Sequence, residues 1–346
     1  MTRNAPPSIG SALGLLALVA CGDPSGPEPT GSFSSSASSV SAASDTWVAQ
    51  ANMPRRLYCC TAAAARTAGG RSVLYVMGGR AITGEVVAAV HAYDVATNSW
   101  SIKAPMPTPL NATNGAALIQ DKIYVSGGIG TRGNARATLF RYDPATNSWT
   151  ARANMPTDTE GGVTAVINNE LYVLTGCGDG AECDQGVIPM VFYRYSPVTD
   201  AWTTLPNPPL TVRPRKAAVF QGKLYTFGGD NRRQIRVFDP ATNRWSSRPA
   251  IPLEHAPRAQ SQRPVVLGGK VYLVGGIEIL PDDTYRPLPT SVYDPSTGTW
   301  VFKAAMPVGQ TTLSADRVVV GAQSRIQVLT SEINAESLHR NWQYIP

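Results

Sequence analysis

One pattern of residues recurs five times along the chain and constrains its fold more than any other feature. In each copy an aromatic residue precedes a Trp by seven positions, and Thr stands four positions after the aromatic residue. The residue after this Thr is Asn, Asp or Gly, the three types that best tolerate a left-handed backbone. The pattern predicts a hairpin turn with an aromatic residue on each flanking strand. The five pairs are Tyr93/Trp100, Tyr142/Trp149, Tyr195/Trp202, Phe238/Trp245 and Tyr293/Trp300.

A second signature stands upstream of each hairpin. It is a run of strand-forming residues that ends in two glycines, as in residues 74–79, and in one copy Thr175 replaces the first glycine. Paired glycines at a strand end predict a close approach to neighbouring backbone, where a side chain would clash. An apolar or small-residue run such as residues 115–119 precedes the signature. Each unit therefore predicts four short strands. The other copies are residues 123–128, 171–176, 224–229 and 271–276.

The double glycine, the Tyr and the Trp, in this order, resemble the kelch repeat. The resemblance covers about 300 residues of the 346-residue chain. It implies an all-β fold, a β-propeller in which each repeat forms one four-stranded blade. The repeated Tyr and Trp residues are interpreted as core between blades.

The two ends of the chain set the number of blades. Trp47 and Pro54 have the Trp-to-Pro spacing found in the five repeats, yet no inner strands precede Trp47. The C-terminal tail has the opposite deficiency. Strands are expected at 317–320, 325–331 and 338–345, but no Trp hairpin follows them to supply an outer strand. We therefore expect a six-bladed kelch-type β-propeller over residues 47–346. Its last blade is closed by the N-terminal strand, which hides the sheet edges.

The N-terminus predicts export. Residues 1–20 contain a short apolar core, and residues 18–21 resemble the lipobox of bacterial lipoproteins. This resemblance implies that Cys21 becomes the lipidated first residue of the mature chain, and that Gly22 directs the protein to the outer membrane. Residues 21–46 are predicted to be a flexible tether, because 17 of the 25 residues after Cys21 are Ser, Gly, Pro or Thr. The expected location is therefore the bacterial cell envelope, with the membrane reached through the lipid anchor alone.

Composition excludes several other classes of function. The chain has 30 Lys and Arg against 24 Asp and Glu, yet it lacks the Lys/Arg-rich runs typical of nucleic-acid binding. Its three histidines are too few and too scattered for a histidine-built metal centre. Motifs for a catalytic nucleophile or a phosphate loop are lacking as well. We therefore predict a monomer that uses neither a metal nor a cofactor and does not bind nucleic acid.

Polar residues that differ between repeats are the candidates for ligand binding. We aligned the inner strands on the Tyr before the glycines. Two positions of this alignment, two residues apart, hold polar residues in several repeats. Because side chains alternate along a strand, both positions are expected to point into the channel. A cluster of arginines with carboxylates suits an anionic or sugar-like ligand, which Arg can clamp with two hydrogen bonds. A solvated channel mouth with internal ion pairs remains the alternative. The candidates are Arg80, Asn114, Glu160, Arg213, Arg215, Asp230, Gln260 and Gln262.

Four cysteines remain after the lipidation site. Cys177 and Cys183 bracket a five-residue loop, and an exported protein meets oxidising conditions, so we predict a disulfide between them. Cys59 and Cys60 are neighbours on the first inner strand. Neighbouring residues on a strand point to opposite faces, so a disulfide between these two would need a strained turn. We therefore interpret them as small buried side chains.

Two functions fit these features. The first is a non-catalytic module that binds a glycan, a peptide or a protein on one propeller face. The second is a periplasmic enzyme on a sugar or sugar acid, similar to the kelch mutarotases. An enzyme requires a deep channel pocket with a carboxylate of perturbed pKa beside an Arg, whereas a binding module requires a face built of loops. The fold alone does not name the ligand.

Overall fold

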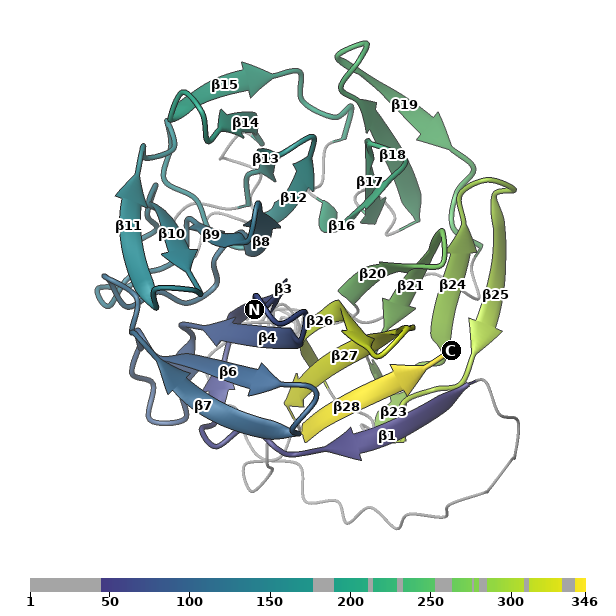
Figure 1. Ribbon diagram of the computed structural model, residues 1–346. Coiled ribbons are helices and arrows are strands. Elements are labelled where there is room, and N and C mark those ends of the chain that lie inside the picture. Colours follow the sequence, from purple (N-terminus) through teal and green to yellow (C-terminus); the bar gives the residue numbers. More distant parts are fainter. Residues whose placement is uncertain are drawn as a thin grey trace, which may run out of the picture.

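The computed structural model shows a ring of six four-stranded antiparallel sheets within its described residues (Figure 1). This arrangement confirms the expected six-bladed β-propeller. The same part of the chain contains no helix long and apolar enough to cross a membrane. The described residues are 45–176, 190–210, 214–228, 233–252, 263–275, 277–279, 285–307, 311–331 and 340–346.

Blades 1 to 3 follow the repeats in order, each with its innermost strand first. Blade 1 consists of β3 (Thr61–Arg66), β4 (Ser72–Met77), β6 (Val90–Asp94) and β7 (Ser99–Lys103). Blade 2 consists of β8 (Gly115–Ile119), β9 (Lys122–Ser126), β10 (Leu139–Asp143) and β11 (Ser148–Arg152). Blade 3 consists of β12 (Val163–Ile167), β13 (Glu170–Leu174), β14 (Phe192–Ser196) and β15 (Ala201–Leu205).

Blades 4 and 5 repeat the pattern, and two short hairpins lie outside the blades. Blade 4 consists of β16 (Pro214–Phe220), β17 (Lys223–Gly228), β18 (Gln234–Asp239) and β19 (Arg244–Arg248). Blade 5 consists of β20 (Arg263–Leu267), β21 (Lys270–Val274), β24 (Thr290–Asp294) and β25 (Thr299–Lys303). The two additional pairs are β2 (Leu57–Tyr58) with β5 (Arg80–Ala81), and β22 (Ile277–Ile279) with β23 (Tyr285–Pro287).

Blade 6 joins the two ends of the chain. The N-terminal strand β1 (Thr46–Gln50) pairs antiparallel with β28 (Arg340–Ile345), and Trp47 lies opposite Tyr344 (Figure 1). The blade is completed by β27 (Gln323–Ser331) and β26 (Thr311–Val320). The predicted closure by the N-terminal strand is confirmed. The innermost strand begins earlier than the expected residue 317, because the pairing of β26 with β27 continues to Thr311.

The repeated hairpin turns have the backbone conformation that their residues predict. The residue two positions before each Trp has a positive φ, for example 49° at Asn98 and 74° at Gly298. The paired glycines have the predicted role as well. A Cβ on Gly79 would lie 2.7 Å from the carbonyl oxygen of Tyr58, and a Cβ on Gly128 would lie 2.8 Å from that of Asn111. Both glycines are therefore required by the close approach of a neighbouring main chain.

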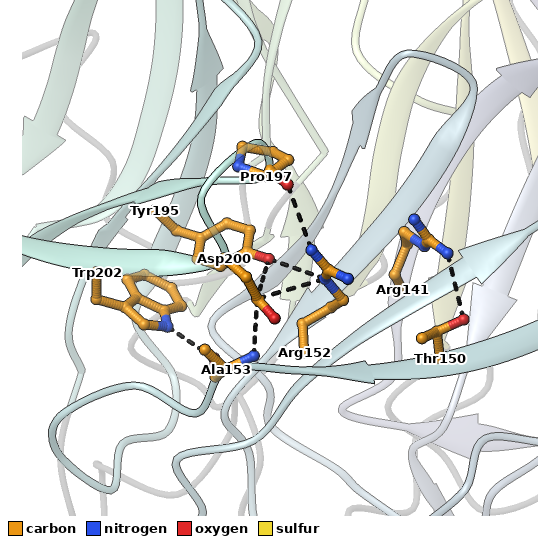
Figure 2. A network of polar contacts seen from close by, with 8 residues as sticks. All are labelled: Arg141, Thr150, Arg152, Ala153, Tyr195, Pro197, Asp200 and Trp202. Atoms are coloured by element: carbon orange, nitrogen blue, oxygen red, sulfur yellow. Dashed lines mark hydrogen bonds and ion pairs between the residues drawn. The ribbon is translucent and has the colours of Figure 1, made fainter.

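In blades 1 to 3 the turn residue also ties the blade to the one before it, as Figure 2 shows for blade 3. In blade 3, the Tyr195 hydroxyl donates to Asp200 Oδ1 at 2.6 Å, and the main-chain N–H of Ala153 donates to the same oxygen at 3.0 Å. Trp202 Nε1 donates to the carbonyl oxygen of Ala153 at 2.8 Å. We call this set of Tyr, turn residue and Trp the latch. It occupies both polar groups of one residue in the preceding blade and so fixes the spacing of neighbouring blades.

Aromatic pairs fill the gaps between blades, as the repeated Tyr residues predict. The ring of Tyr75 in blade 1 lies 5.6 Å from that of Tyr142 in blade 2, and Tyr272 in blade 5 lies 6.0 Å from Tyr344 in blade 6. In blade 6, Gln327 holds the register position that Tyr75 holds in blade 1. It is buried between blades 6 and 1. Its amide bonds neighbouring side chains instead of stacking on a ring, so this interface is polar where the others are aromatic.

Candidate functional site

The two faces of the ring differ in the length of their connections. Tight turns such as Gln120–Asp121 and Asn168–Asn169 join the first strand of a blade to the second on one face. The second and third strands are joined on the opposite face by long connections, for example residues 78–89 and 127–138. The segments that lead from one blade into the next lie on this same face. We call it the loop face, and its connections are long enough to form a binding surface.

Main-chain hydrogen bonds link the first three blades at the loop face. The N–H of Ala112 donates to the carbonyl oxygen of Cys59 at 2.9 Å, and the N–H of Gly161 donates to that of Ala112 at 2.8 Å. All three residues have a positive φ between 46° and 61°. Non-glycine residues rarely adopt this conformation, and such strain is concentrated at functional sites. The rim of the loop face is therefore held in a defined shape.

Arginines are concentrated on the described loops of blades 1 and 2 and on the segment that leads into blade 1. Arg80 follows the first glycine pair and lies opposite Tyr58 in the short β2–β5 pair. Arg136 lies in the corresponding loop of blade 2 and pairs with Thr159 of blade 3. The exposed acidic residues of these loops are Glu85 and Asp158. We call the five basic residues the loop-face arginines: Arg55, Arg56, Arg80, Arg132 and Arg136.

Two of the predicted ligand-binding residues are used inside the protein. Asn114 is only 3% exposed, and its Oδ1 accepts hydrogen bonds from Thr159 Oγ1 at 3.2 Å and from the N–H of Gly162 at 3.0 Å. Thr159 in turn accepts a bond from the N–H of Gly176. Asn114 thus joins blade 2 to blade 3 and does not face the channel as expected. Glu160 is 8% exposed, so its side chain is also largely covered.

The remaining predicted positions are described in part or not at all. Arg80 is partly exposed on the loop face, which agrees with its proposed place at the rim. The main chain of Arg215 lies in β16, but its side chain is outside the described residues. The predicted lipidation, disulfide and ligand-binding residues that fall wholly outside the described residues are Cys21, Cys177, Cys183, Arg213, Asp230, Gln260 and Gln262.

The neighbouring cysteines of blade 1 differ from each other. Cys60 is a buried thiol, whereas Cys59 is disulfide-bonded. The interpretation of both as small buried thiols is therefore wrong for Cys59. The reason is local, because Cys59 does not belong to β3 but lies before it, in a left-handed conformation.

A cavity of about 610 Å³ lies in the channel, and one strand of every blade lines it. Blades 1 to 5 contribute Ala, Leu, Val and Pro side chains, whereas blade 6 contributes Asp316 and Arg317. Burial raises the pKa of Asp316 to about 6, although hydrogen bonds from main-chain N–H groups and the charge of Arg317 oppose the rise. The repeat pattern alone did not single out this carboxyl. An alignment of β26 with the five other inner strands would have revealed it.

The carboxyl of Asp316 is held by its surroundings. Its Oδ2 accepts a hydrogen bond from the N–H of Ala64 in blade 1 at 2.6 Å, and its Oδ1 accepts one from the N–H of Arg317 at 2.7 Å. Each oxygen has a further lone pair available for a ligand. Across the described part of the chain, no three His, Cys, Asp or Glu side chains gather in a group suited to a metal ion.

Comparison with known proteins agrees with this architecture. Residues 60–276, more than half of the chain, match the family model described as the KLHDC2/KLHL20/DRC7 Kelch-repeats domain. The chain is 30% identical to human Kelch-like protein 30 and 31% identical to human Kelch-like protein 21, over 33% and 34% of its length. It is 27% identical to the F-box/kelch-repeat protein At1g22040 of Arabidopsis thaliana over 32% of its length.

These matches span only a part of the curated relatives, namely 19% of each human protein and 26% of the plant protein. A solved structure, that of YjhT, superimposes with a TM-score of 0.62 at 15% identity and covers 85% of this chain and 95% of its own. At this identity the likeness shows the fold. From the matched family model, the repeats and the six blades together, the chain belongs to the kelch-repeat family of β-propellers.

Proposed function

We propose that this protein is an envelope-anchored, non-catalytic binding module whose loop face engages a protein or peptide with an acidic segment. Kelch propellers commonly mediate protein interactions, and the relatives named above are kelch proteins. The observation that carries the proposal is the distribution of loops and charge. The long connections lie on one face, and the loops of blades 1 and 2 together with the segment leading into blade 1 carry the loop-face arginines. Arginine clusters of this kind recognise carboxylates.

Envelope anchoring rests on the N-terminal sequence. The lipobox-like residues 18–21 and the Ser-, Gly- and Pro-rich segment after them support a lipid on Cys21 and a tether that reaches the propeller. A glycan with acidic groups would use the same arginines and is a further possible ligand of this face. The described structure begins at Asp45, so residues 21–44 of the tether lie outside it, whereas Asp45 and Thr46, predicted as its last residues, belong to the propeller.

The alternative of a sugar-acid enzyme has one feature in its favour, the channel carboxyl with the raised pKa beside Arg317. The side chains that the other five blades contribute to that cavity are apolar. Acid–base chemistry on a sugar acid would need further charged or polar side chains beside this carboxyl, and among the described lining residues only Arg317 is one. We therefore favour binding at the loop face over sugar chemistry in the channel.

A peptide-binding measurement tests the proposal. A fluorescein-labelled poly-Glu peptide should bind the purified protein in a salt-sensitive manner, whereas a poly-Lys peptide should not. Arg80→Glu combined with Arg136→Glu should weaken binding about tenfold or more. Arg244→Glu, on the outer strand β19, is the matched control and should bind like the unmodified protein. Equal binding of both peptides, or catalysed mutarotation of D-glucuronate in a polarimeter, would overturn the proposal.

A second experiment tests the anchor. Cys21→Ser should abolish labelling by radioactive palmitate and leave the precursor unprocessed. If this variant matures and sediments with membranes like the unmodified protein, the anchor is wrong, and the loop-face proposal is unaffected.

A further inference from the structure

One position in the channel breaks the repeat of the inner strands. Five inner strands carry a small apolar residue opposite the central Tyr of the second strand. In blade 6 the same register position holds Asp316, which lies opposite Gln327. The five apolar residues are Ala63, Ala117, Ala165, Ala218 and Val265.

A carboxyl at this position lowers the stability of the fold, which suggests that it serves another purpose. Placing a carboxylate among apolar side chains costs free energy, and the raised pKa of Asp316 reports that cost. The two main-chain N–H groups that bond it offset the cost in part. In the other five blades an apolar residue occupies this position, without the cost of burying a carboxylate. Groups retained against stability in this way are characteristic of binding sites.

The size and lining of the cavity define the class of ligand. About 610 Å³ is within the range of small-molecule sites, which are mostly apolar and contain a few placed polar groups. The side chains that blades 1 to 5 contribute are Ala, Leu, Val and Pro, which suit a hydrocarbon or aromatic body. The carboxyl, which accepts hydrogen bonds, suits an ammonium group that donates them.

We propose that the channel cavity is a binding site for a small organic amine with an apolar body, whose ammonium group donates hydrogen bonds to the carboxylate of Asp316. The site lies in the channel, apart from the loop face, and it does not depend on the function proposed for that face. Arg317 also lines the cavity and bears the opposite charge.

The test uses phenethylamine as the probe and 2-phenylethanol as its neutral isostere. Saturation-transfer NMR on the full chain, at millimolar probe concentration, should show binding of the amine and about tenfold weaker binding of the alcohol. This comparison needs no variant, so it stays informative if a substitution impairs folding. Equal binding of the two probes, or no binding of phenethylamine, would overturn the proposal.

Variants then locate the site. Asp316→Asn should weaken phenethylamine binding about tenfold or more, because the charge-assisted hydrogen bond is lost. Ala117→Leu, which fills the cavity at the level of Asp316, should weaken both probes. Asp121→Asn makes the same chemical change at an exposed turn and serves as the control. Thermal melts establish that each variant is folded. A folded Asp316→Asn variant that binds phenethylamine like the control would show that the carboxyl is not the receptor.

Discussion

The hydroxyl of Tyr344 donates a hydrogen bond to Oδ1 of Asp45 at 2.6 Å, which joins residues 299 positions apart in the chain. Asp45 precedes Trp47 by two positions, as Asn98 precedes Trp100. It therefore supplies to blade 6 the acceptor that the turn residue supplies in blades 1 to 3. The latch of blade 6 is built from both ends of the chain, so it forms only when the ring closes.

Removing the Asp45 carboxyl should weaken ring closure. Burial raises the pKa of Asp45, but the bond from Tyr344 and the charge of Lys303 hold it below its ordinary value, so the side chain is a carboxylate at neutral pH. Asp45→Ala should lower the free energy of unfolding by about 1–2 kcal/mol, measured by urea denaturation. Asp45→Asn keeps an acceptor for Tyr344, as Asn98 does in blade 1, and should lose less than Asp45→Ala. An Asn variant as damaged as the Ala variant would contradict the latch.

Deletions test the boundary between tether and propeller. Deleting residues 22–44 should leave the melting temperature unchanged. Deleting residues 45–54 should cause aggregation or a large fall in melting temperature, because it removes β1 and exposes the edge of β28. Equal tolerance of both deletions, in a differential scanning calorimeter, would mean that β1 does not close the ring.

Two glycines of the same loop should respond differently to alanine. Gly79 and Gly84 both have a positive φ, of 107° and 84°, so each substitution incurs backbone strain. Only at Gly79 does the new Cβ also meet main-chain and side-chain atoms, those of Tyr58 and Cys60. We expect Gly84→Ala to cost about 1 kcal/mol and Gly79→Ala about 3 kcal/mol or more in unfolding free energy. Similar losses in the two variants would refute the close-approach explanation.

Replacing His91 by Phe should stabilise the protein, most of all at acidic pH. His91 is 5% exposed, and neither of its ring nitrogens has a hydrogen-bond partner. Burial and the charge of Arg55 lower the pKa of His91 below its ordinary value of 6.5. The unfolded chain therefore binds a proton that the folded protein does not, and stability falls as the pH drops below about 6.5. Phe140 holds the corresponding position in blade 2.

The measurement is the melting temperature of both proteins across this pH range. Relative to the unmodified protein, His91→Phe should gain about 1–2 kcal/mol of unfolding free energy near pH 5 and less near pH 8. Only at acidic pH does the unfolded unmodified chain bind a proton on His91 that the folded protein does not. A gain that does not depend on pH would mean that packing alone explains it.

The state of the cysteines can be read by peptide mapping under non-reducing conditions. We expect Cys59 in a disulfide-linked peptide and Cys60 alkylated only after unfolding, because it is buried. If Cys59 is linked to Cys177 or Cys183, the disulfide predicted between those two does not form. Recovery of Cys59 as a free thiol in the native protein would contradict the bonded state.

Most of the fold was predictable because the repeat records local requirements. A left-handed turn residue such as Asn98 is required by its own backbone conformation, and a glycine such as Gly128 recurs at the same place in successive repeats, so both types can be read without the structure. The number of blades followed from counting these units. The site was less predictable. Asn114 directly precedes the inner strand β8 and Asp316 lies in the inner strand β26, yet one joins two blades and the other lines a cavity.

The sequence by itself determined the repeated blade, the glycine and turn positions and the need for the N-terminal strand to complete the last blade, because each follows from backbone sterics or strand counting. Only the tertiary structure decided what each polar side chain contacts. Gln327 replaces a stacked Tyr, and Asp45 meets Tyr344, through contacts between residues far apart in sequence. Such pairings depend on how the ring brings blades together in three dimensions, and no local spacing along the chain encodes them.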